Sequence, residues 1–282
     1  MLLGGIFLLS LALAVLTGVL SGAFASLAFL WVLPVSFLGI FLGLALLAFL
    51  FMWVCCQLMV DQSKPQEEDS RFYRILARVY VEAILTLVRC RLHLQGMEQL
   101  PKDGRFLLVS NHLNIMDPVV LLHVFRDSQL AFISKKENST MFLVGNLMHK
   151  LQCQLINREN DREALKTILK CISMIKEDKA SVAVFPEGYT SMDGLLHHFR
   201  HGVFKIAQKA KVPIVVVTLQ NTQHILHNAA RLKKTDVQLH LLTVIPPEEL
   251  TGRTATDVGE QVYAMMAADL GPDKVKKYPE NT

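Results

Sequence analysis

Residues 2–60 contain no Asp, Glu, Lys, Arg or His. A helix of about 20 apolar residues crosses a bilayer, so this segment is long enough for two crossings. Pro34 is the natural break, and we expect helices near 3–30 and 36–59 that form a transmembrane hairpin. A cleaved signal peptide would instead have a charged beginning and a shorter apolar core of about 7–15 residues. The pattern therefore predicts a membrane anchor over 1–60.

The basic residues that follow this segment predict its orientation. No Lys or Arg precedes the first span, and several follow the second span from Lys64 onward. Because basic residues are retained on the cytoplasmic side, everything after residue 60 is predicted to be cytoplasmic. Two crossings then place the N-terminus on the same side of a cell membrane.

The charge balance and the cysteines exclude several classes of protein. Lys+Arg 29 and Asp+Glu 25 give a formal net charge of +4, which suits an anionic lipid surface and does not indicate nucleic acid. The five cysteines are odd in number and lack CxxC spacing, so neither a disulfide framework nor a zinc knuckle is indicated. GxSxG, GxxxxGK[ST] and GxGxxG motifs are also absent, which argues against a serine hydrolase, a P-loop NTPase and a dinucleotide-binding protein.

Residues 61–91 are predicted to connect the anchor to a folded domain over 92–282. The polar stretch DQSKPQEEDS is followed by RFYRILARVYVEAILTLVRCRL, in which Ile75, Val79 and Ala83 recur at helical spacing. This amphipathic helix could lie at the membrane interface or pack its apolar face on the domain. Both locations give the same hydrophobic pattern, and the sequence leaves the choice open.

From residue 92 onward, short apolar runs alternate with helical patterns. The expected strands are RFLLVS, LAFIS, CQLI, SVAVF, VPIVVVTL and VQLHLLTVI, and the expected helices lie near 118–126, 139–150, 161–177, 198–210 and 256–269. This alternation predicts an α/β domain with a mostly parallel sheet flanked by helices. In such sheets, functional side chains gather at the carboxyl ends of the strands.

His112 and Asp117 lie in the segment SNHLNIMDP, directly after an expected strand. Asp117 followed by Pro118 is a helix-start signal, because Asp favours the N-cap and proline is tolerated at the first helical position. One carboxylate oxygen can cap the helix while the other accepts from the imidazole, leaving the second ring nitrogen able to take a proton. A capping aspartate beside a surface histidine is the simpler alternative, and this segment alone does not exclude it.

Three further segments follow in order. LQCQLINREN brings Arg158 to the start of the 161–177 helix, where a guanidinium and helix amides suit a phosphate. VFPEGYTSMDG ends a strand at Phe185 and turns at Glu187 and Gly188, where free N–H groups could face a developing oxyanion. KVPIVVVTLQNT is typical of a buried strand. Each of these segments has an ordinary structural explanation when it is taken alone.

Together the four segments resemble the glycerolipid acyltransferase family, of the 1-acyl-sn-glycerol-3-phosphate (lysophosphatidic acid) acyltransferase type. The family pattern is NHxxxxD, an arginine after a short strand, FPEG followed by Thr-Arg-Ser, and a VPI-like strand. The matching residues are Asn111-His112 with Asp117, Arg158, Phe185-Pro186-Glu187-Gly188 and Val212-Pro213-Ile214. All four matches occur in the family's order. This order favours a catalytic role for His112 over the alternative of a surface histidine beside a capping aspartate.

The resemblance implies a membrane-bound O-acyltransferase of phospholipid biosynthesis, with its catalytic domain on the cytoplasmic face. His112 would be the general base on the hydroxyl of a membrane lipid acceptor, and Asp117 would orient it. The hydroxyl would attack the thioester of acyl-CoA or acyl carrier protein, and neither a bound cofactor nor a metal is implied. Substrate binding, including Arg158 on the acceptor phosphate, is expected from Asn111, Arg158, Glu187 and Gly188.

One departure from the family pattern keeps the acceptor open. Residues 189–191 are Tyr-Thr-Ser where the family has Thr-Arg-Ser, so an arginine expected near the acceptor phosphate is absent. Lys205, Arg200 or His201 could substitute for it. The alternatives are therefore an acyltransferase for glycerol 3-phosphate or a non-phosphate lipid, or a catalytically silent membrane protein that binds lipid.

Overall fold

The protein is represented by a computed structural model that describes residues 1–65, 68–191 and 193–277. Positions 66–67 of the predicted linker, position 192 and the last five positions of the predicted 92–282 domain lie outside the described residues. The helices are α1 Leu2–Leu20, α2 Phe29–Trp53, α3 Arg71–Leu87, α4 Asp117–Val124, α5 Val144–Lys150, α6 Asp161–Lys176, α7 Lys205–Ala210, α8 Ile225–Ala230 and α9 Ala255–Leu270. The strands are β1 Cys90–Gln95, β2 Leu107–Ser110, β3 Leu130–Lys135, β4 Gln154–Ile156, β5 Ser181–Val184, β6 Ile214–Gln220 and β7 Thr235–Ile245.

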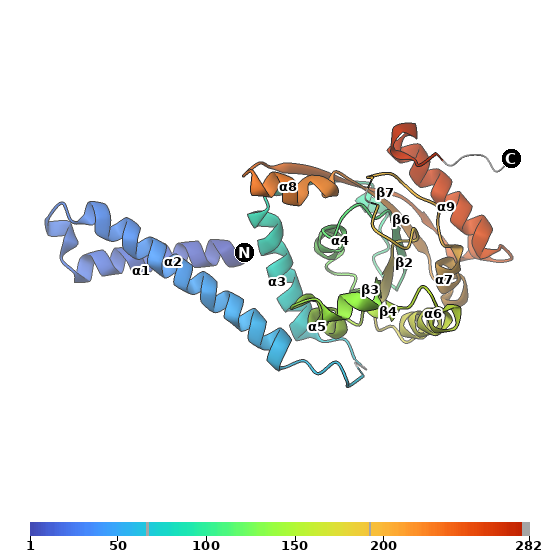
Figure 1. The fold of residues 1–282 in the computed structure, drawn as a ribbon, viewed down its shortest axis with the longest axis horizontal. Helices are drawn as coiled ribbons and strands as arrows, with labels where there is room; N and C mark the ends of the chain where they lie inside the picture. Colours follow the sequence, from blue (N-terminus) through green and yellow to red (C-terminus); the bar gives the residue numbers. More distant parts are fainter. Residues whose placement is uncertain (66–67, 192, 278–282) are drawn as a thin grey trace.

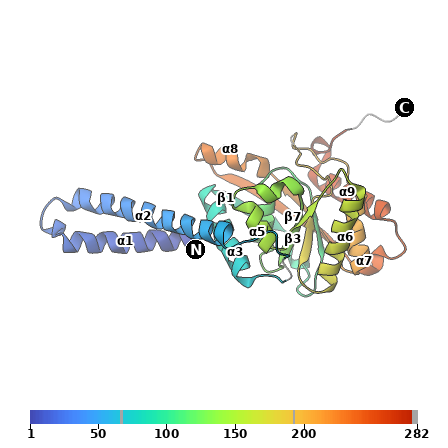
Figure 2. The same ribbon diagram turned by 60° about the horizontal axis from the view of Figure 1, so that its bottom comes forward.

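The two N-terminal helices form a hairpin that projects from the rest of the molecule (Figures 1 and 2). The rings of Phe7 and Phe37 meet edge to face between them, with centroids 5.3 Å apart. By length and composition, Leu2–Leu20 and Phe29–Leu58 are each apolar enough to cross a membrane.

The predicted break at Pro34 is wrong, because this proline lies inside α2. The chain instead turns after Leu20, where Gly22 adopts a left-handed φ of 66° and its N–H donates to the Val19 carbonyl. Glycine takes this conformation without steric strain, which makes it the usual residue just past a helix end. Pro34 removes only one helical hydrogen bond close to the start of α2, and that position tolerates the loss.

The strands of the described residues form one sheet in the order β1-β7-β6-β2-β5-β3-β4. The five strands from β6 to β4 run parallel, whereas β7 is antiparallel to β6 and β1 pairs parallel with β7. The predicted class, an α/β fold with a mostly parallel sheet, is confirmed. The prediction missed β1, because α3 was expected to continue to Leu92, whereas it ends at Leu87 and Arg89 takes a positive φ of 54°.

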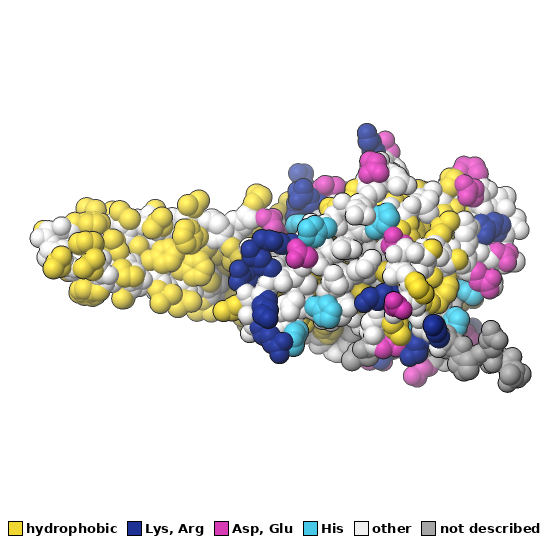
Figure 3. Space-filling view, turned by 90° about the horizontal axis from the view of Figure 1, so that it is seen from above, with side chains coloured by type: hydrophobic (Ala, Val, Ile, Leu, Met, Phe, Trp, Pro, Cys, Tyr) yellow, Lys and Arg dark blue, Asp and Glu magenta, His cyan; other side chains and the backbone are white. Residues whose placement is uncertain are grey.

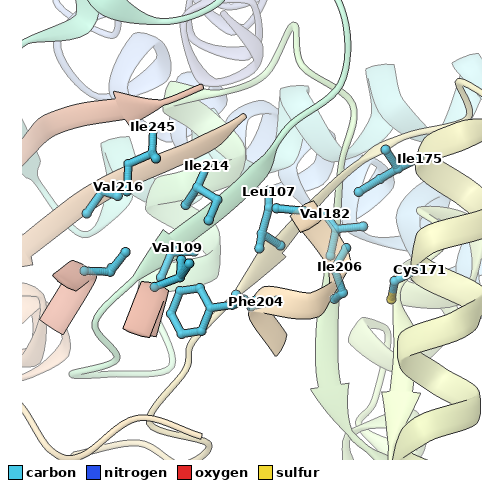
Figure 4. Close-up of a cluster of buried hydrophobic side chains, with 14 of the residues drawn as sticks. Leu107, Val109, Cys171, Ile175, Val182, Phe204, Ile206, Ile214, Val216 and Ile245 are labelled. Atoms are coloured by element: carbon cyan, nitrogen blue, oxygen red, sulfur yellow. The ribbon is translucent and has the colours of Figure 1, made fainter. Parts of the chain in front are cut away.

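Helices cover both faces of this sheet and bury it in two hydrophobic clusters. Helices α6, α7 and α9 pack on one face, which receives the side chains of Leu107 and Val109, as Figure 4 shows. Helices α3, α4 and α8 pack on the other face, against Leu108. Alternate residues of β2 therefore point to opposite layers, and this central strand is uniformly apolar because both of its sides are covered.

Helix α3 has one buried face and one exposed apolar edge. Tyr73, Leu76 and Val81 are buried against neighbouring elements, whereas Ile75, which was expected on the apolar face, is 53% exposed. The packing explains the amphipathic pattern of α3, and its exposed edge remains available to a lipid surface. The amino group of Met1 contacts the Glu82 side chain, so α1 begins beside α3.

Candidate active site

His112 lies in the loop that leaves the carboxyl end of β2, and Asp117 is the first residue of α4, which follows that loop. Nδ1 of His112 is 2.8 Å from Oδ2 of Asp117, whose side chain is completely buried. The same Oδ2 accepts from the backbone N–H groups of Leu113, at 2.6 Å, and Asn114, at 2.7 Å. Asp117 therefore fixes the loop and the imidazole together.

The predicted capping role of Asp117 is wrong. Helix α4 begins at Asp117 itself, its N-cap is Met116, and no side chain caps it. The Asp117 carboxylate instead accepts hydrogen bonds from groups that precede the helix, namely the Leu113 and Asn114 N–H groups and the His112 ring. Its other oxygen, Oδ1, is buried and has no hydrogen-bond partner among the described residues.

The imidazole of His112 is held on three sides. Its plane stacks on the Phe185 ring, with centroids 4.1 Å apart and planes 16° apart. A carboxylate only accepts, so Nδ1 donates to Asp117 and Nε2 keeps its lone pair. The Thr190 hydroxyl lies 2.9 Å from Nε2 and donates to it. The nitrogen that a general base needs therefore faces a hydroxyl group.

Glu187 links the His112 loop to the segment that follows β5. Its Oε1 accepts from the His112 backbone N–H at 2.8 Å, and its Oε2 accepts from the His197 backbone N–H at 2.9 Å. The side chain is 1% exposed, and this burial raises the pKa of Glu187 to about 7. The hydrogen bonds from the two backbone N–H groups act in the opposite direction, because they favour the charged carboxylate. Both oxygens are engaged by backbone, so Glu187 holds the site together rather than pointing at a ligand.

Asn111 and Gly188, both predicted to contact substrate, are also engaged with the protein's own backbone. Asn111 is fully buried, donating to the Leu219 carbonyl at 2.9 Å and accepting from the Leu219 N–H at 2.7 Å. The Gly188 N–H donates to the Phe185 carbonyl at 3.0 Å, so it is not free to face an oxyanion. Asn111 therefore ties the loop after β2 to the end of β6, and Gly188 forms a turn with a φ of 82°.

Arg158 lies just past the carboxyl end of β4, and the other site residues also follow the carboxyl ends of their strands. Its guanidinium is half-buried, and among the described residues it has no hydrogen bond or ion pair. Burial, followed by the nearby charge of Arg200, lowers the pKa of Arg158. A half-buried guanidinium without a partner is consistent with the predicted phosphate site. Arg200 is close enough for its charge to act on Arg158.

The sequence did not predict the hydrogen bond between Thr190 and His112. Thr190 follows β5, and His112 follows β2. These two strands pair in parallel in the sheet, so their carboxyl ends meet. Knowledge of that pairing would have placed Thr190 near His112, but nothing local to either segment encodes it.

Parts of this chain are similar to known proteins. Residues 91–220 match the family model described as Acyltransferase. The chain is 30% identical over 183 residues to a 1-acyl-sn-glycerol-3-phosphate acyltransferase of Chlamydomonas reinhardtii, covering 64% of this chain and 53% of that protein. It is 32% identical over 157 residues to a chloroplastic 1-acyl-sn-glycerol-3-phosphate acyltransferase of Brassica napus, covering 55% of this chain and 44% of that protein. The chain spans about half the length of these curated relatives.

The fold also resembles a solved structure. The crystal structure of the 1-acyl-sn-glycerophosphate (LPA) acyltransferase PlsC from Thermotoga maritima matches with a TM-score of 0.58 at 22% sequence identity. The match covers 73% of this chain and 81% of that chain. It shows that the arrangement of sheet and helices is shared.

Proposed function

We propose that the protein transfers a fatty acyl group from a thioester to a lipid hydroxyl, since residues 91–220 match the family model described as Acyltransferase. The proposed acceptor is lysophosphatidic acid, the product is phosphatidic acid, and the donor is acyl-CoA or acyl carrier protein. The names of the relatives support the acceptor. The observation that carries the proposal is the chain of contacts from Asp117 through His112 to a hydroxyl on Nε2.

The geometry of His112 supports direct transfer. The acceptor hydroxyl takes the place of the Thr190 hydroxyl on Nε2 and gives its proton to His112. Its oxygen forms a bond to the thioester carbonyl carbon, and the carbon–sulfur bond breaks. The thiol of the donor leaves with the proton that His112 has taken. Asp117 stabilises the imidazolium between these two proton transfers, through the Nδ1 hydrogen bond that already exists.

Replacing Thr190 by valine is expected to leave turnover within about tenfold of wild type, because one neutral hydrogen bond is lost and no reacting group is removed. Valine has nearly the shape of threonine, so the Phe185 and His112 rings keep their places. The turnover number with lysophosphatidic acid and acyl-CoA measures the effect, with Thr190→Ser as the matched control. A loss as large as that caused by removing the imidazole would contradict this expectation and show that the reaction requires the Thr190 hydroxyl.

Arg158 is proposed to bind the acceptor phosphate, and its replacement tests the choice of acceptor. Membranes that contain the wild-type protein or Arg158→Ala are assayed with lysophosphatidic acid, glycerol 3-phosphate and monoacylglycerol. Wild type is expected to prefer lysophosphatidic acid. Arg158→Ala is expected to lose roughly tenfold or more in kcat/KM on phosphate-bearing acceptors only, as a charge-assisted bond implies. Equal losses on all three acceptors would remove the phosphate role.

The N-terminal hairpin is proposed to anchor the protein in the cell membrane as a multi-pass segment. Figure 3 shows an apolar rod that joins the body next to a band of Lys and Arg side chains. Such a band favours the cytoplasmic face and the anionic lipid headgroups there. We propose residues 1–60 as the anchor, 61–91 as the linker with the interfacial helix, and 92–282 as the catalytic domain. Such an anchor would keep the catalytic domain at the membrane that contains its lipid acceptor.

A further inference from the structure

The loop that follows β5 holds the His112 backbone from both sides. The His112 N–H donates to Oε1 of Glu187 at 2.8 Å, and the His112 carbonyl accepts from the Ser191 N–H at 2.8 Å. Both of these loop residues are buried. We call residues 187–191 and 193–197 the site loop. Because both polar backbone groups of His112 bond to it, the position of the imidazole depends on the shape of the site loop.

Asp193 connects several groups within the site loop. Its Oδ1 accepts from the Leu195 N–H at 3.2 Å and lies 2.9 Å from the Ser191 hydroxyl. Nε2 of His197 lies 2.8 Å from the same oxygen and donates to it, because a carboxylate only accepts. Lys276, followed by His197, lowers the pKa of Asp193, so the carboxylate is charged at neutral pH. One charged group therefore joins the residue that holds the His112 carbonyl to the rest of the loop.

The chain that follows α9 pairs with the site loop. The Leu196 N–H donates to the Lys274 carbonyl at 2.7 Å, and the Lys276 N–H donates to the Leu196 carbonyl at 3.0 Å, which makes a parallel bridge. The Lys276 ammonium donates to Oδ2 of Asp193 at 2.8 Å, whereas the bonds within the loop use Oδ1. We call residues 274–276 the C-terminal strap. Backbone bonds and an ion pair therefore join the strap to the loop.

The site loop depends on such contacts, because its described residues form neither a helix nor a strand. A loop of this kind keeps one conformation only while its contacts outweigh the entropy of ordering it. Misplacing a reacting group by about 1 Å can lower a rate by about 10²-fold. Contacts that fix the loop therefore act on catalysis through the place of the His112 imidazole.

We propose that the C-terminal strap positions His112 through the site loop, and that Lys276 is the positioning residue that fixes Asp193. The inference rests on the proposed function, which makes His112 the general base. The strap lies beyond residues 91–220, which match the family model, so the match does not include it. The C-terminal segment thus completes a site whose other parts follow β2 and β5.

The kinetic test compares Lys276→Met and Lys276→Arg in the full-length protein in detergent. Lys277→Met is the matched control, because Lys277 is the next residue in the chain and is an exposed lysine. With lysophosphatidic acid and acyl-CoA, kcat is expected to fall roughly threefold to tenfold in Lys276→Met, as loss of a partly exposed bond between charged groups implies. KM for both substrates is expected to be unchanged, because the position of the base affects the chemical step. Lys276→Arg keeps the cation and is expected to restore kcat.

Two kinetic outcomes would overturn the inference. One is a kcat in Lys276→Met that equals the kcat of Lys277→Met. The other is a higher KM for either substrate at unchanged kcat, which would place Lys276 at a substrate.

A double variant tests whether Lys276 acts through Asp193. Adding Lys276→Met to Asp193→Ala is expected to lower kcat no further, because the bond between the two side chains is already lost. Additive losses would show that Lys276 acts elsewhere, and they would also overturn the inference.

Hydrogen exchange measures the hold of the strap without turnover. In Lys276→Met, the amide hydrogens of His112 and Ser191 are expected to exchange roughly threefold to tenfold faster than in wild type, because the loop opens more often. The amides of β1, which pairs with β7, are expected to keep their wild-type rates. Faster exchange in β1 as well would indicate a general loss of stability and would overturn the inference.

The exchange rates also separate this inference from the proposed function. Wild-type exchange of the His112 and Ser191 amides in Lys276→Met would overturn the inference, whatever reaction the protein catalyses. If wild type acylates no lysophosphatidic acid while these amides respond as expected, the proposed function fails and the hold of the strap on the site loop stands.

Discussion

Replacing His112 by alanine is expected to reduce acyl transfer by about 10²–10⁴-fold, because the group that takes the acceptor proton is removed. Asp117→Asn is expected to have an effect of similar size, since the neutral amide of asparagine cannot stabilise the imidazolium as the carboxylate of Asp117 does. The substituted amide can place its nitrogen at the unbonded Oδ1 position and keep its oxygen on the three groups that Oδ2 now binds. The initial rate of phosphatidic acid formation by purified variants measures both effects.

A matched control is available for this prediction. His93 forms a similar pair with Asp236, with Nε2 2.9 Å from Oδ1, but it lies exposed on β1 at the far edge of the sheet. His93→Ala is expected to retain wild-type turnover. The unfolding temperature of each variant is measured as a control for folding, because the His112 side chain is only 16% exposed and its removal takes a partner from the buried Asp117 carboxylate. Retention of wild-type turnover by His112→Ala would show that the base assignment is wrong.

Glu187→Gln is expected to lower the free energy of unfolding by about 1–3 kcal/mol, because one of two buried amides loses its acceptor. The amide nitrogen of glutamine would face the N–H of either His112 or His197, and neither can donate to it. Turnover is expected to fall as well, since the His112 backbone is no longer fixed. Unfolding in detergent measures the stability change, with Glu249→Gln, an exposed position, as the control.

The raised pKa of Glu187 also predicts a pH dependence of stability. Because the folded pKa of about 7 lies above the ordinary value of 4.5, the folded protein holds this proton more tightly than the unfolded chain does. The resulting stabilisation is complete below the ordinary pKa and is lost as the pH rises through about 7, at up to about 1.4 kcal/mol per pH unit. The difference in stability between wild type and Glu187→Gln should therefore be largest at low pH and shrink as the pH rises. A difference that grows with pH would contradict this assignment.

The sequence predicted the central strands well, for a physical reason. Strands such as β5 and β6 are buried on both faces, so their segments are mostly apolar runs. Strand β1 escaped prediction because its partner β7 lies far along the chain and the strand is mostly exposed. The Pro34 break failed because a proline near a helix start is tolerated, whereas Gly22 supplies the left-handed turn that the chain needs.

The candidate site was predicted as a set of residues but not as a set of contacts. His112 and Asp117 meet as expected, because five residues of one loop are enough to bring them together. The bonds from Asn111 to Leu219 and from Glu187 to His112 depend on which strands are neighbours. Strand order is fixed by packing of the whole sheet, and local sequence does not contain it.

The most direct test of the central claim measures both products of one reaction mixture. Purified protein is mixed with acyl-CoA, with and without lysophosphatidic acid, and phosphatidic acid and free CoA are quantified. Direct transfer by His112 predicts equal molar amounts of the two products, formed only when lysophosphatidic acid is present and not by His112→Ala. Release of CoA without the acceptor, or absence of phosphatidic acid from the wild-type reaction, would contradict the account.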